Sequence, residues 1–179
     1  MSLTLATLIP GLLLLVLGGL LLVSNSAIVA SFKALPRSTA ASYALFGAGA
    51  AWFLYHVWYL SAADFGDYRK YLFVGFAVVA VLSFKLVPEF LAVRGLCVLV
   101  LLGAMPLLMA AYQEYDQPQR LFMVSLVYLA IALALYLASV PFRLRDFFDG
   151  LFRAPGRARA VGGVLVAYGV LLAVVAFTY

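Results

Sequence analysis

Six long runs of apolar residues divide the chain, separated by short connections that hold most of its charged residues. A helix needs about 20 apolar residues to cross a bilayer, and the runs approach or reach this length. They are continuously apolar rather than alternating, which favours spanning helices over a β-barrel. The pattern predicts an all-α, polytopic integral membrane protein with about six transmembrane helices, at 3–23, 39–60, 71–87, 90–111, 121–140 and 161–177.

Composition agrees with this class, because 67% hydrophobic and 11% charged residues lie outside the range of soluble globular domains. Six spans use most of the 179 residues, so residues 1–179 are expected to form a single membrane domain. The first run ends at small residues, as the core of a signal peptide does. Its nearest basic residues, Lys33 and Arg37, follow the run instead of preceding it, so we expect an uncleaved first helix.

The distribution of Lys and Arg predicts the orientation of the chain. The connections after the second and fourth runs hold only Arg69, Lys70 and Arg120. Those after the first, third and fifth runs hold Lys33, Arg37, Lys85, Arg94, Arg143, Arg145, Arg153, Arg157 and Arg159. Since cytoplasmic connections are enriched in both residue types, we expect both termini on the outer side of a bacterial inner membrane. The net charge of +5 then reflects topology, and nucleic-acid binding is not expected.

The connection after the fifth run predicts an interfacial amphipathic helix at about 142–153. Its apolar residues recur at the spacing of one helix face, namely Leu144, Phe147, Phe148, Leu151 and Phe152. Arg143, Arg145 and Arg153 lie on the other face, and Asp149 is expected to pair with Arg145 and Arg153. Pro155 and Gly156 should end the helix, before Arg157 and Arg159. This basic segment could dock on anionic lipid headgroups or a partner, or could serve orientation alone.

Three charges interrupt the apolar sequence around the junction of the third and fourth runs: Lys85, Glu89 and Arg94. Pro88 predicts a bend there, which would place Lys85 and Glu89 at the inner interface and let Arg94 reach the headgroups along its own stem. The alternative is that these side chains face other helices and line a polar site for an anion or a proton.

A short internal similarity joins two of the basic segments. Phe32 and Lys33 match Phe152 and Arg153, and Arg37 matches Arg157. It is consistent with a duplication, or with an interfacial segment arising twice in front of a membrane helix.

Candidates for chemistry are few. The lone His56 lies in an aromatic stretch typical of an interfacial belt, and the lone Cys97 lies inside a predicted span. Neither supplies a ligand set, so no catalytic residue, cofactor or metal is expected. Gly47, Gly49, Gly162 and Gly163 are predicted to be close-packing positions between helices.

These observations favour a non-catalytic multi-pass membrane protein, an accessory or structural subunit that packs with lipids, with a membrane protein partner or with copies of itself. A small oligomeric transporter or channel, with a polar site at Glu89 and Arg94, is the alternative. A membrane-embedded enzyme acting on lipid-like substrates has less support, because His56 and Glu89 are predicted on opposite sides of the membrane.

Overall fold

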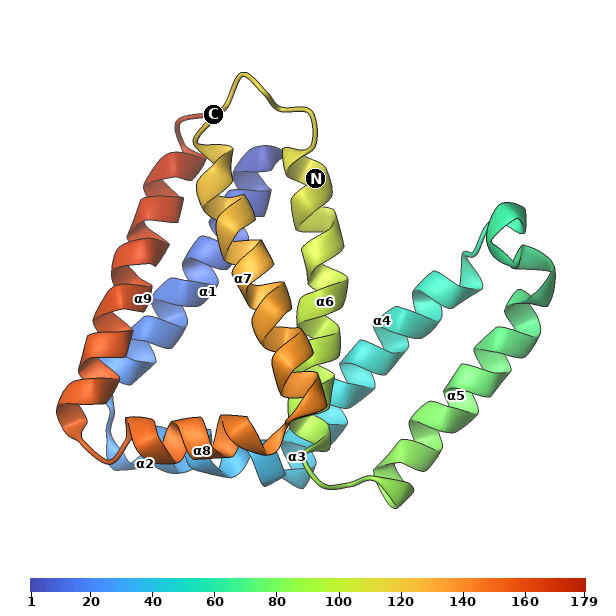
Figure 1. Cartoon of the computed structure of the whole chain (residues 1–179), viewed down its shortest axis with the longest axis horizontal. Helices are drawn as coiled ribbons and strands as arrows, with labels where there is room; N and C mark the ends of the chain where they lie inside the picture. The colour runs from blue at the N-terminus through green and yellow to red at the C-terminus, as the bar shows by residue number, and fades with distance from the viewer. The chain divides into compact units, whose positions relative to one another are not determined.

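All regular secondary structure in the described residues is helical (Figure 1), which confirms the predicted all-α class. The computed structural model describes the backbone of residues 1–179 and every side chain except that of residue 155. The longer helices are α1 (Leu3–Val23), α4 (Gly47–Trp58), α5 (Arg69–Leu86), α6 (Leu91–Ala111), α7 (Arg120–Ser139) and α9 (Pro155–Ala176). The shorter elements are α2 (Ser26–Ala34), η1 (Leu35–Arg37), α3 (Thr39–Ala41), η2 (Ser42–Phe46), η3 (Ala62–Asp64), η4 (Gly66–Tyr68) and α8 (Phe142–Leu151).

Four helices are long and apolar enough to cross a membrane: α1, α6, α7 and the Gly156–Ala176 part of α9. The other two predicted spans are also helical. However, α4 has only 12 residues, and it follows a π-helical turn at Ser42–Phe46. Helix α5 carries Arg69 and Lys70 at its start and Lys85 near its end. The structure therefore supports a membrane protein with four candidate spans, and the count of six stays a prediction.

Helix α9 begins earlier than the sequence pattern predicts. The segment 154–160 was expected to be a connection, but α9 already begins at Pro155. Proline is favoured in the first turn of a helix, where the missing N–H needs no partner. Arg157 and Arg159 then continue the helix, since arginine has a high helix propensity.

The chain packs as two compact units. Unit 1 comprises Met1–Lys33, Gly103–Leu133 and Arg145–Tyr179, and unit 2 comprises Ala34–Leu102 and Ala134–Leu144. Helices α6, α7 and α8 contribute residues to both units. That residues 1–179 act as a single membrane domain remains a prediction.

Unit 1 is organised by an antiparallel pairing of α1 with α9, in which glycines of one helix face glycines of the other. A Cβ atom on Gly18 would lie 2.7 Å from the carbonyl oxygen of Gly162, and one on Gly162 would lie 2.8 Å from that of Gly18. Two helical turns away, a Cβ on Gly169 would lie 2.9 Å from the carbonyl oxygen of Gly11. Small residues at these positions let the two backbones approach closely, as is common between membrane helices.

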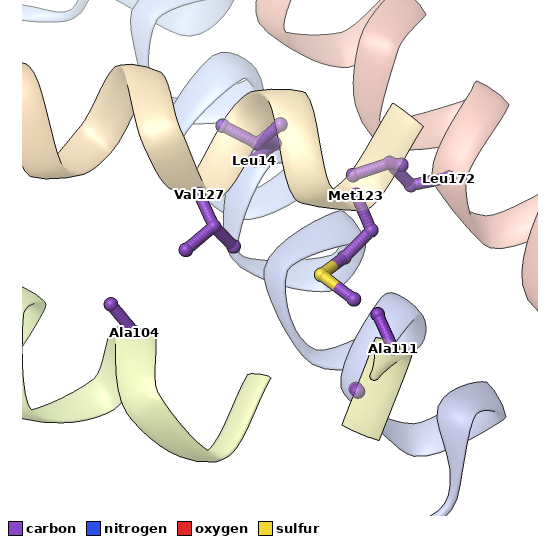
Figure 2. Close-up of a cluster of buried hydrophobic side chains, with 7 residues drawn as sticks. Leu14, Ala104, Ala111, Met123, Val127 and Leu172 are labelled. Carbon is purple, nitrogen blue, oxygen red and sulfur yellow. The ribbon is translucent and has the colours of Figure 1, made fainter. Parts of the chain in front are cut away.

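A core cluster of unit 1 consists of aliphatic side chains from α1, α6, α7 and α9 (Figure 2). Met123 of α7 and Leu172 of α9 are fully buried in it. The cluster as a whole contains Ala6, Leu14, Ala104, Ala111, Met123, Val127 and Leu172. Packing of this kind holds the start of α7 and the end of α6 against the α1–α9 pair.

Hydrogen bonds define one end of unit 1, which we call the terminal end. The Thr7 hydroxyl donates to the Tyr179 hydroxyl over 3.2 Å. Gln119, just before α7, donates through Nε2 to Thr178 Oγ1 over 3.3 Å. Because α1 and α9 are antiparallel, their opposite ends lie together as well, next to α2 and α8; we call this the α8 end.

Unit 2 contains α4 and α5, which pack through aromatic side chains. The rings of Phe53 and Phe76 meet edge to face with centroids 5.0 Å apart, and those of Trp58 and Phe73 do so at 5.3 Å. His56 is exposed, on the helix that also carries the aromatic stretch. Such pairs add to the packing of a hairpin beyond the area they bury.

Helix α6 approaches the π-helical turn of unit 2 at Gly95. A Cβ atom there would meet the backbone nitrogen of Phe46 and lie 2.5 Å from its Cα. Gly49 also lies close to α6, since its Cβ would be 3.1 Å from a methyl carbon of Val98. These backbone contacts leave room for glycine alone at position 95.

Two of the four predicted close-packing glycines are confirmed. Gly49 and Gly162 meet another helix, whereas a Cβ on Gly47 or Gly163 would have no neighbour within 4 Å among the described residues. Successive helical residues are rotated by about 100°, so adjacent or next-adjacent glycines cannot face one neighbour together. The predictions for Gly47 and Gly163 are therefore wrong within this chain.

Candidate functional site

The predicted interfacial segment packs against α2 at the α8 end of unit 1. The ring centroid of Phe32 lies 5.4 Å from that of Phe148 and 6.0 Å from that of Phe152. Lys33 Nζ lies 3.6 Å from Asp149 Oδ1. Aromatic packing and an ion pair therefore join two segments that are far apart in the sequence.

These two segments form what we call the α2–α8 surface. Its members are Phe32, Lys33, Arg145, Asp146, Phe147, Phe148, Asp149, Phe152, Arg153 and Arg157. Both segments run across the direction of α1 and α9 at their α8 end (Figure 1). Two short helices that lie across the ends of longer ones can expose one side to the plane of a membrane interface.

An apolar cluster anchors this surface to the end of the α1–α9 pair. Leu151 is only 5% exposed and packs with Leu21 of α1 and Ala158 of α9. Phe32, Phe148 and Phe152 are packed around the same cluster. The aromatic side chains that join α2 to α8 therefore also rest on the end of the helix pair.

The predicted phenylalanine face divides between two environments. Phe148 and Phe152 are half-buried against Phe32, while Phe147 is 52% exposed and lies beside Phe148 with ring centroids 5.7 Å apart. Phe147 is thus the most exposed phenylalanine of the α2–α8 surface. It is available for insertion into an apolar environment.

The charges pair differently from the prediction. Asp149 was expected to pair with Arg145 and Arg153, but it pairs with Lys33. Arg145 instead binds its neighbour Asp146, with Nε to Oδ1 at 3.0 Å and Nη2 to Oδ1 at 2.7 Å. Spacing along one helix identifies only candidate partners within that helix. Lys33 reaches Asp149 because α2 packs beside α8.

The other predicted basic residues are solvent-accessible. Arg153, Arg157 and Arg159 are exposed, and Arg157 Nη1 donates to the carbonyl oxygen of Gly150 over 3.4 Å. In unit 2, Arg143 lies over the ring of Phe142 with Cζ 5.7 Å from the centroid. Both ion pairs are exposed, so water screens them and the cations keep most of their capacity to bind external anions.

Sequence reasoning missed α2 and the roles of Phe32 and Lys33. A nine-residue helix between two apolar runs is too short to give a clear periodic signal. The available signal was the match of Phe32 and Lys33 to Phe152 and Arg153. The Phe32 and Phe152 of that match are in contact in the folded chain.

The second predicted site, at Lys85, Glu89 and Arg94, lies in unit 2. Lys85 and Glu89 are exposed around the α5–α6 connection, and Arg94 is half-buried in the first turns of α6. A pocket of about 380 Å³ is lined by Arg37, Thr39, Pro88 and Glu89. The carboxylate of Glu89 therefore shares a pocket with Arg37, which the sequence did not single out for this role.

Arg37 also borders the turn that starts α6. Its Cζ lies 5.4 Å from the ring centroid of Phe90, and Phe90 has a φ of 57°, in the left-handed region that is uncommon for a bulky residue. Arg37, Glu89 and Thr39 thus line one pocket beside an unusual turn. This arrangement could hold a small polar solute.

Among the described side chains, no group of three His, Cys, Asp or Glu residues is placed to hold a metal ion. A comparison with protein-family models, with curated proteins and with solved structures finds no match to this chain. Its function must therefore be argued from its own sites.

Proposed function

We propose that the chain is a non-catalytic accessory subunit that lies in a membrane and packs with other membrane components. It docks on anionic lipid headgroups through the α2–α8 surface. The pairing of α2 with α8 across one end of the α1–α9 helix pair is the observation that supports this function. It gathers basic residues and an exposed phenylalanine on one side of two short helices.

The lengths of these helices support an interfacial position. At 1.5 Å per residue, α2 and α8, with nine and ten residues, extend about 14 and 15 Å. This is half the thickness of the hydrocarbon core, so neither can cross it. Helices of this size with basic and aromatic residues typically lie in the headgroup region.

Charge supports an anionic target. The exposed cations of the α2–α8 surface and Arg159 outnumber its carboxylates, Asp146 and Asp149. A basic residue near an anionic leaflet contributes about 1 kcal/mol to binding. The same excess of basic residues supports a cytoplasmic location for this end, with both termini outside, in a bacterial-type inner membrane.

The accessory role also requires contacts with other membrane components. Gly163 of α9 and Gly19 of α1 lie away from the close approaches of the α1–α9 pair, in space open among the described residues. Small residues on lipid-facing sides of spans allow close packing by helices of another chain or of a second copy.

Site-specific labelling tests the docking. In a Cys97→Ser background, we expect an environment-sensitive dye on Phe147→Cys, in vesicles containing phosphatidylglycerol, to be quenched by brominated lipid. A dye on Arg153→Cys should be quenched by aqueous iodide instead. Equal quenching of both positions by iodide, with no effect of brominated lipid, would mean that the surface is solvated and the proposal is wrong.

Removal of the charges tests the lipid preference. The variant Arg145→Gln/Arg153→Gln/Arg157→Gln should bind phosphatidylglycerol about a hundredfold more weakly and retain less of it after purification, because three headgroup contacts of about 1 kcal/mol each are lost. The matched control is Arg69→Gln/Lys70→Gln, whose exposed cations lie in unit 2. Native mass spectrometry measures the bound lipid. Equal retention by wild-type and triple-variant protein would contradict an electrostatic role.

A small transporter or channel is the second candidate, and the pocket lined by Arg37 and Glu89 favours it. If the pocket lies on a transport path, Glu89→Gln should abolish solute or proton flux in proteoliposomes while leaving the fold intact. Absence of any flux in the wild-type protein would count against this candidate.

A further inference from the structure

A pocket at the terminal end of unit 1 is lined by an arginine that forms no ion pair with a carboxylate among the described side chains. It has a volume of about 280 Å³ and lies between the end of α6, the connection that follows and the start of α7. Arg120, the first residue of α7, lines it together with Tyr112, Tyr115 and Tyr128. We call it the Arg120 pocket.

The guanidinium of Arg120 is held in place but not neutralised. Its Nη1 is buried and has no hydrogen-bond partner among the described residues. Its Cζ lies 4.9 Å from the ring centroid of Tyr115, so the cation rests on an aromatic face. The carboxylates of the same connection, Glu114 and Asp116, belong to exposed residues.

Arg120 as a whole is half-buried, but its buried Nη1 is costly to leave without an acceptor. A buried charged donor that lacks an acceptor loses its hydration without compensation. Elsewhere in the chain, Lys33 and Arg145 are at the surface and nevertheless have carboxylate partners. The position of Arg120 at the start of a 20-residue helix adds the positive end of the helix dipole. Both features favour an anion.

The rest of the pocket selects the kind of anion. Its wall includes aliphatic side chains such as Leu108, Met109 and Val124, which belong to the candidate spans α6 and α7. Tyr112 and Tyr128 line the same pocket, and tyrosine is enriched where spans meet the headgroups. A ligand that fits both parts has an anionic head and an apolar tail.

We propose that the Arg120 pocket binds the phosphate of an anionic phospholipid, with the guanidinium donating to phosphate oxygens and an acyl chain lying along Met109 and Val124. Arginine suits this role because its planar donors match phosphate oxygens in pairs. The site does not depend on the α2–α8 surface, since Gln119 and Thr178 tie it to the opposite end of α9.

Native mass spectrometry of the full chain in mild detergent, titrated with phosphatidylglycerol, tests the site. We expect Arg120→Gln to lower the affinity by about tenfold or more, as loss of a charge-assisted hydrogen bond does. Arg120→Lys should lose less, because the charge remains. The matched control is Arg69→Gln, which removes an exposed arginine from the first position of α5 and should leave the affinity unchanged.

Three outcomes would overturn the proposal. Wild-type affinity in Arg120→Gln would show that the guanidinium does not bind the lipid. Equal losses in Arg120→Gln and Arg69→Gln would indicate a general charge effect. An affinity for inorganic phosphate equal to the affinity for phosphatidylglycerol would indicate a free anion as the ligand. Circular dichroism of each variant confirms that it remains folded.

Discussion

Replacing Gly18 with valine is expected to destabilise unit 1 by about 3 kcal/mol, because the new side chain overpacks a contact between two backbones. Its Cβ would lie 2.7 Å from the carbonyl oxygen of Gly162 and 2.9 Å from the backbone nitrogen of Val166. Neither atom can move unless α9 moves as a whole. Unfolding in mixed micelles, followed by far-UV circular dichroism, measures the loss.

The neighbouring glycine provides the control. A Cβ on Gly19 would have no atom within 4 Å among the described residues, so Gly19→Val should change the free energy of unfolding by no more than about 0.5 kcal/mol. The two variants have the same composition and differ only in which side of α1 carries the new methyl groups. Equal effects at both positions would contradict the α1–α9 pairing described above.

Replacing Gly95 with alanine should destabilise unit 2 by about 2 kcal/mol, although only one methyl group is added. That methyl group would meet the backbone of Phe46 and lie 2.7 Å from the carbonyl carbon of Leu45. The π-helical turn would have to move away from α6. Trp52 and Trp58, the chain's two tryptophans, both lie in α4, so their fluorescence reports the unfolding of unit 2.

Gly47→Ala is the matched control for this prediction. Gly47 directly follows the π-helical turn and is open to space among the described residues. Alanine is favoured over glycine in a helix by up to about 1 kcal/mol, so this variant should be as stable as wild type or more stable. If Gly95→Ala is also neutral, α6 does not approach Phe46 as closely as the structure indicates.

Local signals were sufficient to predict the long apolar helices from the sequence. Helix α1 has the predicted bounds, and Ser2 caps it by accepting a hydrogen bond from the Leu5 amide. An apolar run and a capping residue are both local, so they need no knowledge of the fold. The sequence pattern does not predict the start of α9, because Pro155 suits the end of one helix as well as the beginning of the next.

The candidate sites were harder to predict, because their partners are distant in the sequence. Lys33 pairs with Asp149 only because α2 packs on α8. In the sequence, Arg120 is one of three basic residues predicted on the outer side, and its charge says nothing about burial. What distinguishes it is the pocket built by α6 and α7 and the buried Nη1. Charge and spacing can nominate such residues, but burial and pairing require the tertiary structure.

The pairing of α1 with α9 also has a consequence for how the protein is made. A ribosome synthesises α1 well before α9, so α1 exists for an interval without its partner. During that interval, Gly11 and Gly18 face lipid, or a helper protein of the insertion machinery, in place of Gly169 and Gly162. Assembly of unit 1 therefore has to follow synthesis of α9, and a chain stalled before that point would present the glycine face of α1 to its surroundings.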